Sequence, residues 1–229
     1  MKYLRQIIVA VLFSSVILSC DLLGNSGLTE EEVIEGLKEA LKVGSENSVD
    51  STARHDGYFG NPIIKIPFPQ EAQVVADVLE TAGFGALIDD AVESINRAAE
   101  DAADDALPIF IDAITAMTIQ DGSEILYGED SAATHYLREK TWTQLFDLFE
   151  PKIQTSLDAV GATQYWDDVI NTYNSIPFVD PVNTDLGEYT TDKALKGLFV
   201  ITKDEEKNIR DNPEARVNDI LQKVFGELD

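Results

Sequence analysis

Apolar residues recur three or four positions apart along almost the whole chain, and this spacing leaves few folds open to it. The run Val33, Ile34, Leu37, Ala40 and Leu41 is typical, and it is the repeat of a helix with one buried face. No stretch alternates apolar and polar residues over a useful length, as a half-buried strand does. The sequence therefore predicts an all-α fold, a single irregular bundle of about nine helices.

Short polar residues mark where several of these helices begin. Thr29 and Thr118 are each followed three positions later by an acidic residue, which is the spacing of a capping box. Ser131 precedes a long stretch of helical periodicity and is expected to cap that helix. Asn212 stands before Pro213 and is expected to cap the last helix, whose inward residues include Val217.

A stretch with three prolines separates the first two helices. Residues 60–69 hold Pro62, Pro67 and Pro69, and proline suits neither a helix interior nor a central strand. We predict an extended segment that crosses the bundle near 60–69. Its apolar side chains either pack over the core or form an exposed docking surface, and we favour packing. The candidate docking residues are Tyr58, Phe59, Ile66 and Phe68.

Residues 1–19 have the parts of an export signal. Lys2 and Arg5 precede an apolar run over residues 7–18, and this run is shorter than the ~20 residues that a membrane-spanning helix needs. The sequence Ile17-Leu18-Ser19-Cys20 resembles a lipobox, whose cysteine sulfur receives a diacylglycerol before the signal is cut. We therefore expect residues 1–19 to be removed and Cys20 to carry lipid.

The expected cleavage divides the chain into three parts. Residues 1–19 are the signal peptide, residues 20–28 are the lipidated cysteine with a short flexible tether, and residues 29–229 are one acidic helical domain. Cys20 is the only cysteine, so we expect no internal disulfide. A lipid on Cys20 predicts a membrane-anchored protein of the bacterial envelope that faces the periplasm, with the choice between inner and outer membrane left open.

The expected mature chain is strongly acidic. The whole chain has 17 basic and 42 acidic residues, and the signal removes two of the basic ones, which leaves a net charge of −27. Such a charge argues against binding to nucleic acid and against lying flat on anionic lipid. It permits cationic partners, which include divalent ions and basic protein surfaces.

Acidic residues and one histidine offer metal ligands without completing a metal motif. His135 and Glu139 are four positions apart and share a helix face, which provides two ligands of a transition-metal site. Calcium prefers about six to eight oxygen ligands. The two densest acidic patches contain Asp101, Asp104 and Asp105, and Asp121, Glu124, Glu129 and Asp130. Neither patch follows the EF-hand pattern, so we expect solvated acidic faces and predict no cofactor.

Two helices carry a group of polar side chains that includes several of the scarce cations. The group consists of Asn96, Arg97, Glu100, Thr134, Arg138 and Lys140. Its members either line a pocket for an anionic or polar ligand or form bridges between helices, and we favour bridges, because buried arginines usually pair with carboxylates. No nucleophile motif such as Gly-x-Ser-x-Gly occurs, and carboxylate pairs arise by chance in so acidic a chain.

Several stretches of the domain match one known pattern, in the same order along the chain. They are Asp56 to Pro62, Ile66 to Pro69, Ile95 to Glu100, Met117-Thr118 with Asp121, Ile125 to Gly128, Ala133 to Thr141, Lys193 to Phe199, Glu205-Glu206, Ile209 to Pro213, and Lys223 to Phe225. In these stretches the chain resembles the bacterial "domain of unknown function 4197" lipoprotein family. The resemblance implies a helical, exported, single-domain protein and brings no established activity.

Together these features favour a non-enzymatic binding or interaction domain in the bacterial envelope, with an envelope protein as a candidate partner. One alternative is a helical pocket protein that binds a small molecule, a lipid or a divalent cation. Another is an envelope hydrolase that uses carboxylates. A deep apolar cavity would favour the pocket protein, and two carboxylates facing each other across a groove would favour the hydrolase.

Overall fold

The computed structural model describes residues 27–81, 83, 85–159 and 185–227, together with residues 161, 163, 166, 167, 170, 171, 174, 177, 178 and 181. This part of the chain contains eight α-helices and no strand, so the all-α prediction is confirmed and the helix count is near the expected one. The helices are α1 (Glu30–Ala53), α2 (Gln73–Thr81), α3 (Gly85–Ala103), α4 (Ala106–Thr115), α5 (Ile119–Leu126), α6 (Ala132–Ala159), α8 (Leu186–Asp211) and α9 (Asp219–Gly226). Single 3-10 turns form at Gln70–Ala72 and Pro213–Ala215. The predicted signal and Cys20 lie outside the described residues.

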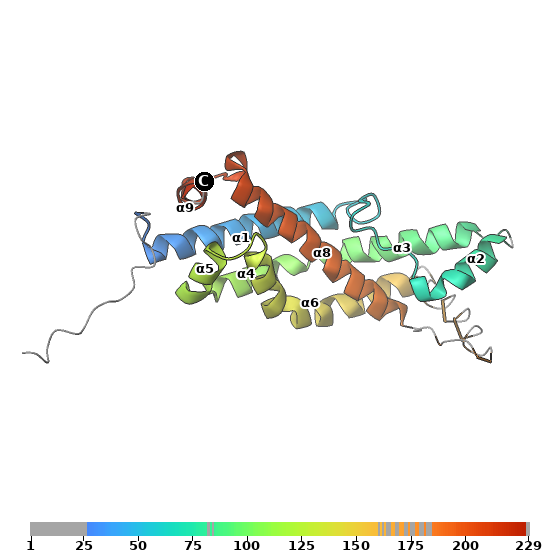
Figure 1. Ribbon diagram of the computed structural model, residues 1–229. Helices are drawn as coiled ribbons and strands as arrows, with labels where there is room; N and C mark the ends of the chain where they lie inside the picture. The colour runs from blue at the N-terminus through green and yellow to red at the C-terminus, as the bar shows by residue number, and fades with distance from the viewer. Residues whose placement is uncertain are drawn as a thin grey trace, which may run out of the picture.

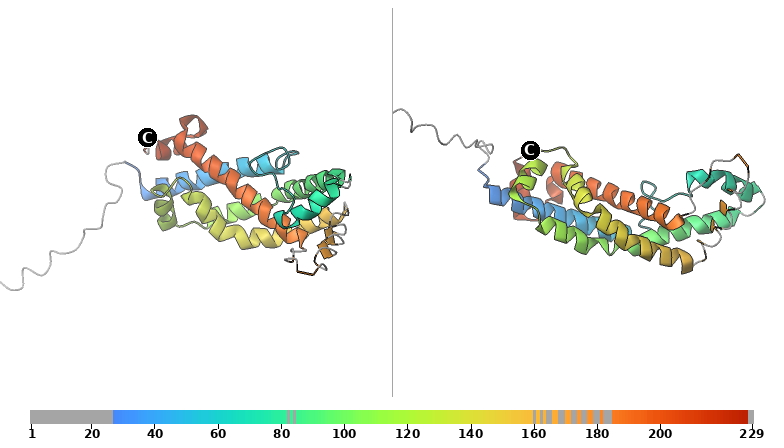
Figure 2. Two further views of the ribbon diagram at one scale, coloured as in Figure 1. Left: turned by 45° about the vertical axis from the view of Figure 1, so that its right-hand side comes forward. Right: turned by 90° about the horizontal axis from the view of Figure 1, so that it is seen from below.

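The helices form an elongated bundle in which α8 lies diagonally across α1, α3 and α6 (Figure 1). Helices α4 and α5 pack against α1 in the half of the bundle where α1 begins, and α9 folds back onto α1. The hairpin of α2 and α3 forms the opposite end, as two further views show (Figure 2). In the ranges described above, no helix combines the length and apolar character needed to cross a bilayer.

The core is built from one buried face of each long helix. Phe110 of α4, Phe149 of α6 and Leu195 of α8 are fully enclosed, and each buried side chain of this size contributes about 1.5–3 kcal/mol to stability. On α3 the buried stripe includes Ala98 and Ala99. These small side chains allow α6 to approach α3 closely, and the two helices pack against each other.

Acidic residues gather at the C-terminal end of α3, where the negative end of the helix dipole disfavours them. A lysine from α6 compensates for them. Lys152 Nζ lies 3.0 Å from Asp105 Oδ2 and 4.0 Å from Asp101 Oδ2. This ion-pair group joins α3 to α6 and includes two of the three aspartates in the first acidic patch considered as a calcium site, Asp101 and Asp105.

The capping boxes at Thr29 and Thr118 are confirmed. Thr29 Oγ1 accepts a hydrogen bond from Glu32 N at 3.2 Å, and Glu32 Oε2 accepts one from Thr29 N at 3.1 Å. Thr118 and Asp121 form the same reciprocal pair. Each box satisfies two backbone N–H groups that would otherwise lack a partner at the helix start.

The cap predicted at Ser131 is wrong, because a residue from α8 takes its place. Glu206 Oε1 accepts from Ala133 N at 3.0 Å, and Glu206 Oε2 accepts from Thr134 N at 2.8 Å. These are the two N–H groups that an N-cap side chain at Ser131 would satisfy. The hydroxyl of Ser131 makes no hydrogen bond within the part of the chain that the structure describes, and it is not one of the polar atoms there that are closed off from solvent.

Thr118 and Ser131 should therefore respond differently to the same change. We expect Thr118→Ala to lower the free energy of unfolding by about 1 kcal/mol, the usual cost of a lost N-cap. Ser131→Ala should change it by less than about 0.5 kcal/mol, because Glu206 still caps α6. Urea unfolding followed by circular dichroism measures both values. Equal losses in the two variants would show that Ser131 does cap the helix.

The C-terminal end also departs from the expectation. Asn212 caps only the 3-10 turn Pro213–Ala215, by accepting from Glu214 N at 3.0 Å. Helix α9 begins later, and its cap is Asn218. Val217, predicted to face inward, lies between the two and is 67% exposed. The prediction that the last helix starts at Pro213 is therefore wrong, since α9 begins only at Asp219.

Candidate functional site

Three members of the predicted polar group lie on α3 and hold the segment 54–69. Asn96 Oδ1 accepts from Ile66 N, and Asn96 Nδ2 donates to Ile66 O, both at 2.8 Å. Glu100 Oε1 accepts from Tyr58 N at 3.1 Å and from Phe59 N at 3.0 Å. The side chains of Asn96 and Glu100 thus supply the hydrogen bonds that a neighbouring strand would give this non-helical backbone.

Arg97 completes this arrangement from the solvent side. Its guanidinium lies 2.7 Å from Glu100 Oε2, 2.8 Å from Asp56 Oδ1 and 3.2 Å from Glu93 Oε1. The hydrogen bond from Arg97 holds the pKa of Asp56 below its usual value. Asp56 itself has a φ of 64°, a left-handed conformation that favours glycine and costs energy in other residues. Because Arg97 pairs with all three of these carboxylates, its charge is already neutralised within the protein.

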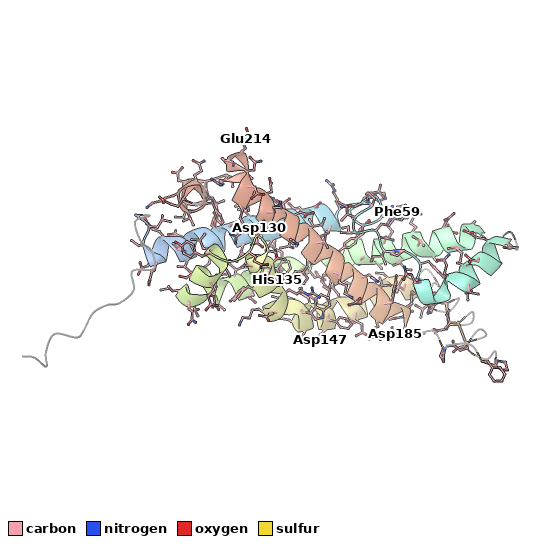
Figure 3. All side chains as sticks on the ribbon, viewed as in Figure 1. Phe59, Asp130, His135, Asp147, Asp185 and Glu214 are labelled. Atoms are coloured by element: carbon pink, nitrogen blue, oxygen red, sulfur yellow. The ribbon has the colours of Figure 1, made fainter. Side chains whose placement is uncertain are left out.

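The candidate docking residues are mostly packed. Tyr58 is fully buried and donates from its hydroxyl to Ala194 O at 2.7 Å, and burial raises the pKa of this phenol. Ile66 is also buried, and Phe68 meets Trp166 edge to face at 5.2 Å between ring centres. Phe59 (labelled in Figure 3) is half-buried and is flanked by two cations.

Thr134, the fourth member of the polar group, belongs to a separate buried network that the sequence analysis did not predict. Its hydroxyl donates to Glu206 Oε2 at 2.7 Å, and Glu206 pairs with Arg210 one turn further along α8. Arg210 Nη2 donates to Ile125 O at 2.9 Å, at the C-terminal end of α5. The carboxylate lies at the positive end of α6 and the guanidinium at the negative end of α5, so both complement helix dipoles.

The two remaining members of the polar group stay near the surface of α6. The Arg138 guanidinium lies 4.8 Å from the centre of the Trp142 ring, and Lys140 Nζ lies 5.4 Å from that of Tyr136. The six residues thus divide into the α3 set, the Thr134 network and these exposed cations. They do not form one shared pocket.

An open groove of about 360 Å³ lies between α5 and the beginning of α6. Its lining residues are Asp121, Glu124, Ile125, Glu129, Ser131, Ala132, His135, Tyr136, Glu139 and Lys140. The groove unites two candidate sets that the sequence kept apart, namely the acidic patch at 121–129 and the pair of His135 with Glu139. His135 is labelled in Figure 3. Asp130 does not line the groove and lies 3.9 Å from Lys207 Nζ.

The charges that line the groove are unevenly balanced. Four carboxylates face one lysine. The hydroxyl and the amide of Thr118 lower the pKa of Asp121, and the charge of Lys140 adds to this effect. Burial, and then the charge of Asp121, raises the pKa of Tyr136. In the described residues, no three side chains of His, Cys, Asp or Glu come together in a way that could hold a metal ion.

A second, apolar cavity lies among α1, α6, α8 and α9. Its volume is about 20 Å³, and Leu37, Leu41, Ile209 and Phe225 are among its lining residues. A cavity of this size holds roughly one water molecule. It has no room for a lipid or for another small-molecule ligand.

Comparisons with known proteins identify a family and give no activity. No curated protein matches the chain, and no solved structure matches it either. The model of a family described as a protein of unknown function (DUF4197) matches residues 27–226, which is almost the whole described structure. The chain therefore belongs to the DUF4197 family.

Proposed function

We propose that the protein is a non-enzymatic binding protein of the bacterial envelope, held to a membrane by lipid on Cys20, which binds a positively charged ligand in the α5–α6 groove. The groove is the observation on which this proposal rests. Its volume of about 360 Å³ falls within the ~300–1,000 Å³ typical of small-molecule sites. Its excess of carboxylates favours a cation.

Two features argue against the alternatives of a lipid carrier and a carboxylate hydrolase. The apolar cavity is too small for an acyl chain. A hydrolytic general acid needs a carboxyl group with a raised pKa, whereas the pKa of Asp121 in the groove is lowered, so Asp121 does not suit that role. Both features favour a binding function.

The expected anchor adds a location to this proposal. Residues 21–27 span at most ~25 Å when fully extended, and they lead to the end of the bundle where α1 begins and where α5 packs (Figure 1). The groove therefore belongs to the end of the domain nearer the anchor. A ligand released or displayed close to the membrane surface would therefore meet the groove before it meets the opposite end of the domain.

Native mass spectrometry on the full-length protein, purified from its own envelope in mild detergent without chelators, tests the binding function. We expect a stoichiometric additional mass of tens to hundreds of daltons that is lost when Glu129 and Glu139 are replaced by glutamine. A bare lipoprotein mass would oppose a tightly bound small ligand. An added mass that survives both substitutions would place the ligand outside the groove.

Lipid attachment is tested separately by metabolic labelling with an alkyne analogue of palmitate. We expect the natural protein to be labelled and its mature N-terminus to be Cys20. Cys20→Ser should abolish the label, since lipidation requires the thiol. Ser26→Ala, a change in the same tether, should keep it. Label on the Cys20→Ser protein would contradict the proposed anchor.

A further inference from the structure

The hairpin of α2 and α3 extends beyond the core of the bundle (Figure 2). Within the described part of the chain, α2 packs mainly on α3 and on the 3-10 turn that precedes it. The first half of α3, residues 85–94, contributes no residue to the described core, which α3 enters only at Ile95. A helix of nine residues such as α2 is marginally stable by itself and depends on packing for most of its stability. A further helix packed on α2 would therefore stabilise it.

One face of α2 presents apolar side chains to solvent. Val74 is 58% exposed and Val75 is half-buried, whereas Ala76 is enclosed. Residues two positions apart in a helix point about 200° apart, so Val74 points away from the side of α2 that packs. On α3, Ile88 and Val92 are half-buried and do not pack against the described core. The hairpin thus has more apolar surface than its two helices cover, and such a surface is typical of an interaction site.

The charge of the hairpin indicates what kind of partner covers this surface. Residues 70–96 include six acidic residues and no lysine, arginine or histidine. Four of these carboxylates are exposed and form no ion pair with a described residue, namely Asp77, Glu80, Asp89 and Asp90. Because the whole chain carries a net charge of −25, a second copy is repelled from this surface, whereas a basic partner is attracted to it.

We propose that the α2–α3 hairpin binds a basic amphipathic helix of another envelope protein, which becomes the third helix of a small bundle with α2 and α3. Val74 and Asp77 are three positions apart and so share one face of α2. The apolar stripe of the partner helix packs on Val74 and Val75, and its lysine or arginine residues pair with Asp77 and the other exposed carboxylates. The hairpin lies at the opposite end of the bundle from α5 (Figure 1), so this inference does not depend on the groove of the proposed function.

A synthetic peptide of leucine and lysine tests this inference on the full-length protein in nonionic detergent at physiological salt. The peptide has about 18 residues, enough for a stable helix, and leucine recurs at every third or fourth position to give one apolar stripe. We expect it to slow the hydrogen exchange of the α2 amides, residues 73–81, because a third helix stabilises this short one. The peptide concentration that gives half of the full protection measures the affinity.

Matched variants separate the hairpin from other exposed residues. Val74→Ser should raise the half-protecting concentration by about tenfold, since two methyl groups leave the contact, while the similar helix propensities of valine and serine preserve α2 itself. Val217→Ser changes a valine that is 67% exposed beside α9 and should leave the concentration within about twofold. Asp77→Asn should raise it by about fivefold, the upper end for an exposed ion pair. Asp147→Asn, which removes an exposed charge on α6, should leave it within about twofold.

A scrambled peptide of the same composition, in which the leucines lack helical spacing, should leave the exchange of α2 unchanged. Equal protection by this peptide would indicate attraction by charge alone and would overturn the inference. Equal effects of Val74→Ser and Val217→Ser, or no protection by either peptide, would also overturn it. Protection of α2 in phosphatidylcholine nanodiscs without any peptide would assign the exposed face to lipid and not to a protein helix.

Discussion

Replacing Glu206 with alanine is expected to lower the free energy of unfolding by about 3–5 kcal/mol, the usual cost of removing one half of a buried ion pair. The carboxylate is 8% exposed and accepts hydrogen bonds from Ala133 N, from both N and Oγ1 of Thr134, and from Arg210. Its loss leaves the start of α6 uncapped and the Arg210 guanidinium buried without its carboxylate. Urea unfolding followed by far-UV circular dichroism measures the change.

The adjacent Glu205 provides the control for this experiment. It is only half-buried and accepts one hydrogen bond from Asn47 Nδ2 at 3.0 Å. Glu205→Ala should therefore cost less than about 1 kcal/mol, the net value of one such bond. If the two variants lost equal stability, the joining of α5, α6 and α8 through Glu206 would be refuted.

Most of the fold could be predicted from the sequence because its signals are local. Helical periodicity involves residues three or four positions apart, and the capping boxes at Thr29 and Thr118 involve residues three positions apart. The cap of α6 could not be predicted in this way. Ser131 has the right type and position, yet the competing acceptor lies 72 residues from Thr134 and reaches it only after α8 has packed.

The sequence predicted only separate parts of the candidate site, because the contact that joins them is between residues of two different helices. Sequence reasoning selected His135 and Glu139 by their helical spacing, and Asp121 by its acidic neighbourhood. It had no means of knowing that α5 packs beside the first turns of α6 and so makes one groove of them. The same limit applies to Arg97 and Arg138, which look alike in sequence and lie in unrelated surroundings.

The i, i+4 spacing of Glu206 and Arg210 was the one available signal for the buried pair. In a helix this spacing places both side chains on one face, and here it is the face that also carries Thr202 and Ile209 inward. Such pairs are common on exposed helices of acidic proteins. Only burial distinguishes this pair from those, and burial is a property of the packed bundle.

Replacing Glu100 with alanine is the second change for which we expect a large effect, a loss of roughly 2–4 kcal/mol in the free energy of unfolding. The side chain is 6% exposed, and one of its oxygens accepts from the backbone of both Tyr58 and Phe59. Without it, two amides of a non-helical segment lose their acceptor in the interior. The segment then depends on Asn96 and on the buried Tyr58 side chain alone.

Glu93→Ala is the matched variant, because Glu93 contacts the same arginine at 3.2 Å but is 51% exposed. It should cost less than about 0.5 kcal/mol, as exposed ion pairs do. Hydrogen exchange distinguishes local loosening from general destabilisation. In Glu100→Ala the Tyr58 and Phe59 amides should exchange faster than that of Ile66, which Asn96 still holds. Unchanged protection of these two amides would mean that packing, and not Glu100, fixes the segment on α3.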